Sequence, residues 1–142
     1  MKIVHITAHL GAGAGKAIVG ISRMMQKIDP EVHTEIILAE APEKLQAVRQ
    51  AEEAGIPVSI CPHWDEMLSS CETADYIILD WWAHPMMFPL LLKLEGLSCR
   101  IILWNHFNGV IFPHLSFNFL SAFSHVLFTC RYSFAFCGGE RS

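Results

Sequence analysis

Residues 2–18 read KIVHITAHLGAGAGKAI, and this stretch decides the class of fold. The segment Lys2–Thr7 is apolar and rich in β-branched residues, which predicts a strand buried on both faces. A glycine-rich turn follows at residues 11–15, and from Ala14 to Ile28 apolar side chains recur at the 3.6-residue spacing of a helix. A buried strand, a glycine turn and an amphipathic helix in this order are typical of the start of an α/β domain.

The same alternation continues along the chain. We expect further strands at residues 35–39, 57–61, 76–80, 100–104 and 126–129, with intervening helices that begin at Pro42, Asp65, Pro85 and Pro113. This pattern predicts an α/β fold, a doubly wound Rossmann-like parallel sheet of about six strands with helices on both faces. Right-handed crossovers favour the strand order 3-2-1-4-5-6, with the proline-containing third strand at an edge.

Candidate ligand-binding residues follow the predicted strands. In such sheets ligands bind beyond the carboxyl ends of the strands, near the switch between the first and fourth strands. The residues at these ends are Gly13 and Gly15 after the first strand, Trp82 and His84 after the fourth, and Asn105 and His106 after the fifth. The loops that carry them meet at one crevice, so we expect the set to form a binding site.

The glycine turn fits no complete nucleotide motif. A Walker A motif needs Gly where Leu10 stands and Ser or Thr where Ala17 stands, and Lys16 holds the place of the third glycine of the dinucleotide fingerprint. Glycines still let a backbone approach a ligand closely, and the first turn of the next helix favours an anion. Phosphate contact and a plain strand-to-helix turn are both compatible with this loop.

Three other groups allow two interpretations each. Asp80 is either a catalytic carboxylate or a residue that fixes the end of the fourth strand, and Trp81 and Trp82 either stack on a ring or fill the core. Cys61, His63 and Cys71 lack the fourth ligand of a zinc site, so we expect a core thiol and a loop histidine and no metal.

Composition excludes several classes of protein. The chain has 142 residues, 52% of them hydrophobic and 17% charged, which argues against disorder and against a small disulfide scaffold. A net charge of −4 gives no electrostatic footprint for nucleic acid, and no segment reaches the roughly 18 apolar residues of a membrane span. Five cysteines without CxxC spacing favour reduced thiols, and we expect a cytoplasmic location.

Charge is unevenly distributed between the two halves of the chain. Residues 76–142 hold only seven Asp, Glu, Lys and Arg side chains, and eight of the nine phenylalanines follow residue 100. A half with so little charge has difficulty covering its own surface with polar groups. We therefore expect an exposed apolar patch at residues 107–136.

Five segments in order resemble the N-terminal domain of GT-B glycosyltransferases, especially the retaining enzymes of family 4. The first strand with the run Gly-Ala-Gly-Ala-Gly-Lys-Ala at 11–17 is similar to that family's first strand and GGAGxA loop. Residues 56–58 resemble its third strand, 75–85 its fourth strand and following loop, 101–106 its fifth strand, and 125–133 its sixth. The resemblance covers residues 1–133, as one Rossmann-like domain.

The resemblance implies a sugar transferase that needs no cofactor, with a nucleotide-sugar donor as substrate. His106 matches the histidine that contacts the transferred sugar, Gly13 and Gly15 would lie near the donor diphosphate and the acceptor, and Trp82 and His84 would line the acceptor side. Asn105 departs from the small residue usual before that histidine, which leaves the acceptor open. Residues 134–142 would be a truncated tail at the start of the link to a missing second domain, which holds most of the donor, so we expect the isolated chain to be inactive.

The sequence allows one alternative function and disfavours another. The alternative is a non-catalytic Rossmann-like domain that binds a nucleotide or a partner, such as a second Rossmann-like subunit. A nicotinamide-dependent oxidoreductase is disfavoured because the glycine fingerprint fails and Glu40 is the single weak candidate for a ribose-binding acid.

Overall fold

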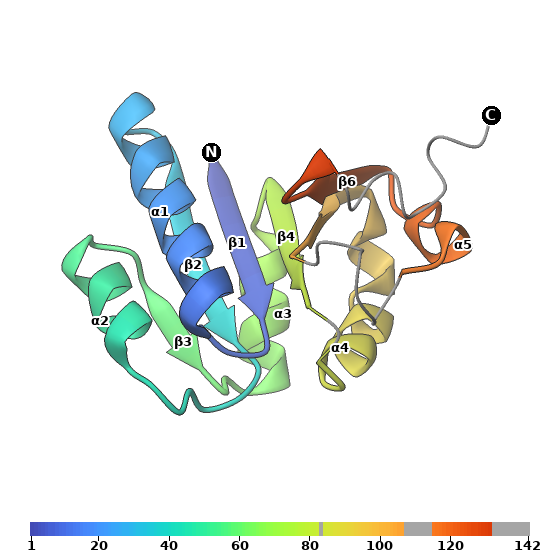
Figure 1. Cartoon of the computed structure of the whole chain (residues 1–142), viewed down its shortest axis with the longest axis horizontal. Coiled ribbons are helices and arrows are strands. Elements are labelled where there is room, and N and C mark those ends of the chain that lie inside the picture. Colours follow the sequence, from blue (N-terminus) through green and yellow to red (C-terminus); the bar gives the residue numbers. More distant parts are fainter. Residues whose placement is uncertain (83, 107–114, 132–142) are drawn as a thin grey trace.

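Strand β1 (Lys2–Thr7) lies inside a six-stranded sheet with the order β3-β2-β1-β4-β5-β6, and every strand pair is parallel. The computed structural model describes residues 1–82, 84–106 and 115–131 (Figure 1). The fold is therefore the α/β Rossmann-like sheet that the sequence predicts, and β3 lies at an edge.

Helices and strands alternate along the whole described chain. After β1 come α1 (Ala12–Ile28), β2 (His33–Leu38), α2 (Gln46–Glu53), β3 (Val58–Ile60), α3 (Trp64–Glu72), β4 (Tyr76–Trp81), α4 (Met87–Lys93), the 3₁₀ helix η1 (Glu95–Arg100), β5 (Ile101–Asn105), α5 (Phe117–Leu120) and β6 (His125–Phe128). The bounds of β1 are those expected from the sequence, and the other strands shift by one or two residues.

Every described α-helix starts at a residue other than the expected one: α3 begins at Trp64 and not Asp65, and α4 at Met87 and not Pro85. Helix α1 begins at Ala12, within the predicted glycine turn, and the Gly15 amide donates to the Gly11 carbonyl at 2.7 Å. Helix α2 begins at Gln46 and not at Pro42, and the chain just beyond β2 still pairs with the end of β1. The Glu40 amide, for example, donates to the Ala8 carbonyl at 2.8 Å. The helix expected to begin at Pro113 is described only as α5, and Pro113 itself lies outside the described residues.

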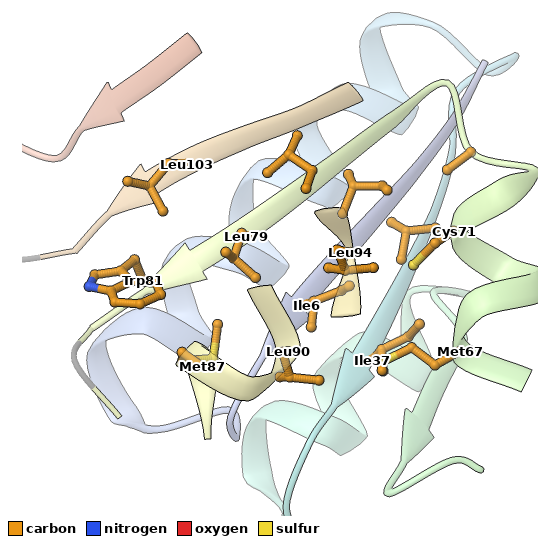
Figure 2. Close-up of a cluster of buried hydrophobic side chains, with 14 of the residues drawn as sticks. Ile6, Ile37, Met67, Cys71, Leu79, Trp81, Met87, Leu90, Leu94 and Leu103 are labelled. Carbon is orange, nitrogen blue, oxygen red and sulfur yellow. The ribbon is translucent and has the colours of Figure 1, made fainter. Parts of the chain in front are cut away.

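The largest part of the hydrophobic core lies between the sheet and helices α3, α4 and α5. Leu79 and Trp81 of β4 and Leu103 of β5 are fully buried there. Figure 2 shows these side chains gathered with Met87, Leu90 and Leu94 on one side of the strands. Successive side chains of a strand point to opposite faces, so residues 78 and 80 of β4 lie on the other face.

Helices α1 and α2 cover that other face over β1, β2 and β3 (Figure 1). Ile18 and Val19 of α1 and Val48 of α2 pack there against Ile36 and Leu38 of β2. A smaller group on the same face includes Ile3, Ile78, Ile102 and Trp104. The carboxyl ends of β1, β4 and β5 are thereby brought to one rim of the sheet.

Parts of two sequence expectations concern residues that the structure does not describe. The tail at residues 134–142 lies outside the described ranges, as do residues 107–114 of the expected apolar patch. Among the residues described, no helix is both long enough and apolar enough to cross a membrane.

Candidate functional site

A buried carboxylate joins two histidines from neighbouring strands. Asp80 Oδ2 lies 2.8 Å from His5 Nδ1, and Asp80 Oδ1 lies 3.0 Å from His106 Nε2. Asp80 and His5 have no exposed side-chain surface, whereas the His106 side chain is 7% exposed. The chain His5–Asp80–His106 therefore runs from the interior of the sheet to its rim.

Strand register explains why these three residues meet. In the sheet His5 pairs with Ile78, and Asp80 pairs with Trp104. His5 and Asp80 are thus diagonal neighbours on one face, and His106 stands two residues beyond Trp104 on that same face. This face does not hold the large hydrophobic core, so the three hydrogen-bonded side chains do not interrupt that core.

The hydrogen bonds assign the imidazole tautomers. An ionised carboxylate only accepts hydrogen bonds, so the proton of each ring lies on the nitrogen that faces Asp80. His5 then carries its proton on Nδ1, and its Nε2 is buried without a partner among the described residues. His106 donates through Nε2–H to Asp80, and in the singly protonated ring Nδ1 is left as an acceptor.

A second cluster of rings lies at the ends of β1 and β4. Trp82 Nε1 donates to Thr7 Oγ1 at 3.1 Å, and the Trp82 ring packs edge-on against the His9 ring, with 4.6 Å between centroids. The His84 ring lies 5.2 Å from Trp82, and its Nε2 is 3.3 Å from Glu40 Oε2. These half-buried aromatic faces and polar edges can bind a ligand that has both apolar faces and hydroxyl groups.

The two glycines predicted to contact ligand occupy different environments. Gly15 is buried, and a Cβ placed there would lie 3.1 Å from Ala47 Cβ and 3.2 Å from the Leu10 carbonyl carbon. Its lack of a side chain lets α1 pack closely against the chain beside it. Gly13 is exposed, and a Cβ there would meet nothing within 4 Å. Of the two, Gly13 is the one whose surroundings leave space for a ligand.

A pocket of about 300 Å³ lies between the first turn of α1 and the segment that leads into α2. Its basic residues are Lys16 and Lys44, its acidic residue is Glu43, and His9 and Gly11 form part of its wall. The first turn of α1 contains no acidic residue, and no side chain caps its N-terminus. The positive end of the helix and two ammonium groups make this pocket suited to an anion.

Asn105 does not lie on the open rim. It is the last residue of β5, it is buried, and its carbonyl accepts a hydrogen bond from the Thr129 amide at 3.3 Å. The carboxyl end of β5 thus presents His106, while Asn105 is held between neighbouring strands. Of the six candidate residues, His106, Trp82, His84 and Gly13 reach the rim or the surface, whereas Asn105 and Gly15 are interior.

Cys61 and Cys71 have separate environments. Cys61 is exposed, whereas Cys71 of α3 lies in the large core, where burial raises the pKa of its thiol to about 11 and the nearby Glu35 carboxylate adds to the rise. Within the described ranges no group of three His, Cys, Asp or Glu side chains is arranged to hold a metal ion.

Sequence reasoning missed His5 as a member of the site and left Asp80 with two interpretations. A signal was present, because each is a polar residue inside an otherwise apolar strand. A polar residue at such a position needs a partner, and the strand ends that lie side by side supply one. Trp81 fills the core, since it is fully buried, whereas Trp82 lies at the rim. The two interpretations of the tryptophans, core packing and ring stacking, therefore apply to different residues.

Comparisons with protein-family models, with curated proteins and with solved structures found no match for this chain. No comparison therefore identifies a family for this chain, and the glycosyltransferase resemblance stays a prediction from the sequence.

Proposed function

We propose that this chain is the acceptor-side domain of a sugar transferase of the GT-B type, which acts together with a donor-binding Rossmann-like domain. The single observation that carries the proposal is the position of His106 beyond β5, backed by the buried Asp80 carboxylate at 3.0 Å. A histidine with a fixed ring at the end of β5, one strand from the switch between β1 and β4, is suited to hydrogen-bond a hydroxyl group of the transferred sugar.

The surrounding residues take complementary roles in this proposal. Trp82 and His84 line the acceptor side, where their rings lie 5.2 Å apart. Gly13 allows the donor diphosphate to approach the first turn of α1, and Gly15 supports that turn by packing against Ala47. Asn105 acts indirectly, because it is buried beside His106 and holds the end of β5.

Catalysis in this proposal depends on the second domain. Departure of the nucleoside diphosphate develops negative charge, and stabilisation of that charge is usually the largest catalytic contribution. The described rim supplies His84 and His106, each held by hydrogen bonds or an ion pair, and no cluster of arginines. We therefore expect the purified 142-residue chain to bind a nucleotide-sugar without transferring the sugar, and measurable transfer by the chain alone would refute this division of labour.

Binding can be tested with a panel of nucleotide-sugars in a thermal-shift assay and by isothermal titration calorimetry. We expect at least one member to raise the melting temperature, and the variant His106→Ala to weaken its binding about tenfold, as loss of a hydrogen bond from a fixed imidazole implies. The matched control is His33→Ala, since His33 is an exposed histidine of β2 far from the rim. The site assignment fails if no nucleotide-sugar binds, or if both variants bind equally well.

A second candidate function is the binding of a nucleotide without catalysis. It is favoured by the pocket of about 300 Å³ beside α1, with Lys16 and Lys44 on its wall. This candidate expects a nucleoside diphosphate to bind as tightly as its sugar conjugate, with no effect of His106→Ala. The transferase proposal expects the conjugate to bind more tightly, and expects that advantage to disappear in His106→Ala.

A further inference from the structure

We propose that His5 is a positioning residue, which acts through Asp80 to hold His106 in a single orientation and tautomer with Nδ1 free to accept a hydrogen bond from a ligand. The identity of that ligand as a sugar rests on the proposed function. The fixed tautomer of His106 does not rest on the proposed function, because it follows from hydrogen bonds within the chain itself.

The Asp80 carboxylate is shared between two histidines. Its two oxygens have separate partners, His5 Nδ1 at 2.8 Å and His106 Nε2 at 3.0 Å. A hydrogen bond to one oxygen fixes the rotation of the carboxylate about its Cβ–Cγ bond, and this directs the other oxygen toward the end of β5. Without His5, the carboxylate would be free to turn away from His106.

The second feature is the energetic cost of burying a histidine at position 5. The neighbouring β1 residues Ile3, Val4 and Ile6 are buried and apolar, whereas His5 has no exposed surface and leaves Nε2 without a partner among the described residues. Replacing a buried polar pair by apolar side chains of similar volume is often neutral or stabilising. Packing alone therefore does not account for a histidine here, and its hydrogen bond to Asp80 does.

The third feature is the surroundings of the three hydrogen-bonded side chains, His5, Asp80 and His106. Trp104 lies on the same face, with its ring centroid 6.3 Å from that of His5 and 4.6 Å from that of His106. This ring shields the two imidazoles and the carboxylate from water on one side. Hydrogen bonds to a charged group are stronger where water is excluded, so the Asp80 bonds restrict His106 more than exposed bonds would.

The experiment compares three substitutions at position 5 by the ¹⁵N spectrum of the imidazole rings, with the His106 signals identified by their loss in His106→Ala. The Nδ2 amide of Asn stands near the place of His Nδ1, so His5→Asn keeps the donor toward Asp80. His5→Gln moves the donor toward the place of Nε2, and His5→Leu removes it.

We expect the proton of the His106 ring in the original protein and in His5→Asn to lie mainly on Nε2. In His5→Gln and His5→Leu, the ratio of the Nδ1–H to the Nε2–H tautomer should rise about fivefold, as expected when a hydrogen bond to a charged group is weakened. The exposed His33 is the matched control, since His33→Leu should leave the His106 signals unchanged.

A fourth variant tests the intermediate carboxylate. Asp80→Asn keeps the size of the side chain but replaces one of the two acceptor oxygens by an amide donor, so His5 and His106 can no longer both donate to it. We expect one of the two rings, the one that faces the amide donor, to move its proton to its other nitrogen. If His5→Leu does not fold, the pair His5→Asn and His5→Gln decides the same question.

The proposal is overturned if His5→Asn and His5→Gln give the same His106 spectrum, or if both His5 and His106 keep their tautomers in folded Asp80→Asn. These results are separable from the proposed function. Failure of every nucleotide-sugar to bind would refute the transferase without bearing on the tautomer of His106. An unchanged tautomer in the variants would remove the role of His5 while leaving sugar binding intact.

Discussion

The two faces of strand β4 are built for different purposes. Leu79 and Trp81 point toward α4, where both are completely enclosed by apolar side chains (Figure 2). Asp80, between them in the sequence, points to the opposite face and is held by His5 and His106. Strand geometry sends neighbouring side chains to opposite faces, so a continuous core and a buried charged group coexist within six residues of chain.

The second face is also less completely covered toward β6. Leu127 of β6 pairs with Trp104 and is 46% exposed, whereas Leu103 on the covered face of β5 is fully buried.

Phe117 of α5 is 63% exposed, and Leu120 one turn later is buried. The apolar patch expected from the low charge of the second half thus has exposed members among the described residues. The comparison between the two faces makes measurable predictions.

The largest effect is expected in the covered core. Leu79→Ala removes a fully buried side chain from the centre of the sheet and should lower the free energy of unfolding by about 2–5 kcal/mol, because it leaves a cavity. Leu92→Ala, at a 75% exposed site on α4, is the control and should change it by less than about 0.5 kcal/mol. Urea denaturation measures both, and similar losses would contradict the core described here.

Cys71 tests how well water is excluded from the same core. Its pKa of about 11 means that roughly one thiol in a thousand is ionised at pH 8, so alkylation should be far slower than at the exposed Cys61. Peptide mapping after a timed pulse of iodoacetamide measures the two rates. Equal rates would show that water reaches Cys71.

The same pKa predicts a dependence of stability on pH. The folded protein holds the Cys71 proton more tightly than the unfolded chain, whose thiol has the ordinary pKa of about 9. Below pH 9 the contribution of this group to stability is fully present, and it is lost as the pH rises through about 11. The difference between the original protein and Cys71→Ala isolates this contribution from other groups that titrate in this range. A constant difference from pH 8 to pH 11 would contradict it.

The first turn of α1 offers a comparison on the other face. Gly13→Ala adds a methyl group in open space and should stabilise the helix by up to about 1 kcal/mol. Gly15→Ala gains the same helix propensity but places its Cβ within 3.2 Å of the Leu10 backbone, and overpacking costs about 1–3 kcal/mol. Thermal unfolding should therefore rank Gly15→Ala below Gly13→Ala, and the reverse order would show that α1 can move away from its neighbours.

The smallest effect is expected at the exposed part of β6. Leu127→Thr keeps a residue with high strand propensity and removes apolar surface that is already half in water, so stability should change by less than about 0.5 kcal/mol. A loss above about 1 kcal/mol in urea denaturation would mean that this face is covered in solution, and the contrast between the two faces would be weaker than described.

Much of the fold could be predicted from local patterns. The apolar run at 2–7, the repeated helix spacing after it and the turn residues between elements specify six strands, and crossover handedness then fixes their order. The same reasoning located His106, Trp82 and His84 at the carboxyl ends of strands. The start of α2 was misplaced, because a proline is tolerated at the first position of a helix but does not by itself start one.

The sequence by itself determined the class of fold, the strand order and the loops that surround the rim. Only the tertiary structure decided which polar residues act together. His5 and Asp80 are 75 residues apart along the chain, and they meet through the register of β1 with β4, which no local pattern encodes. Packing likewise places Gly15 and Asn105 in the interior, and Gly13 and His106 at the surface or the rim. Periodicity assigns residues to helices and strands, but only the packing of these elements decides which side chains reach a ligand.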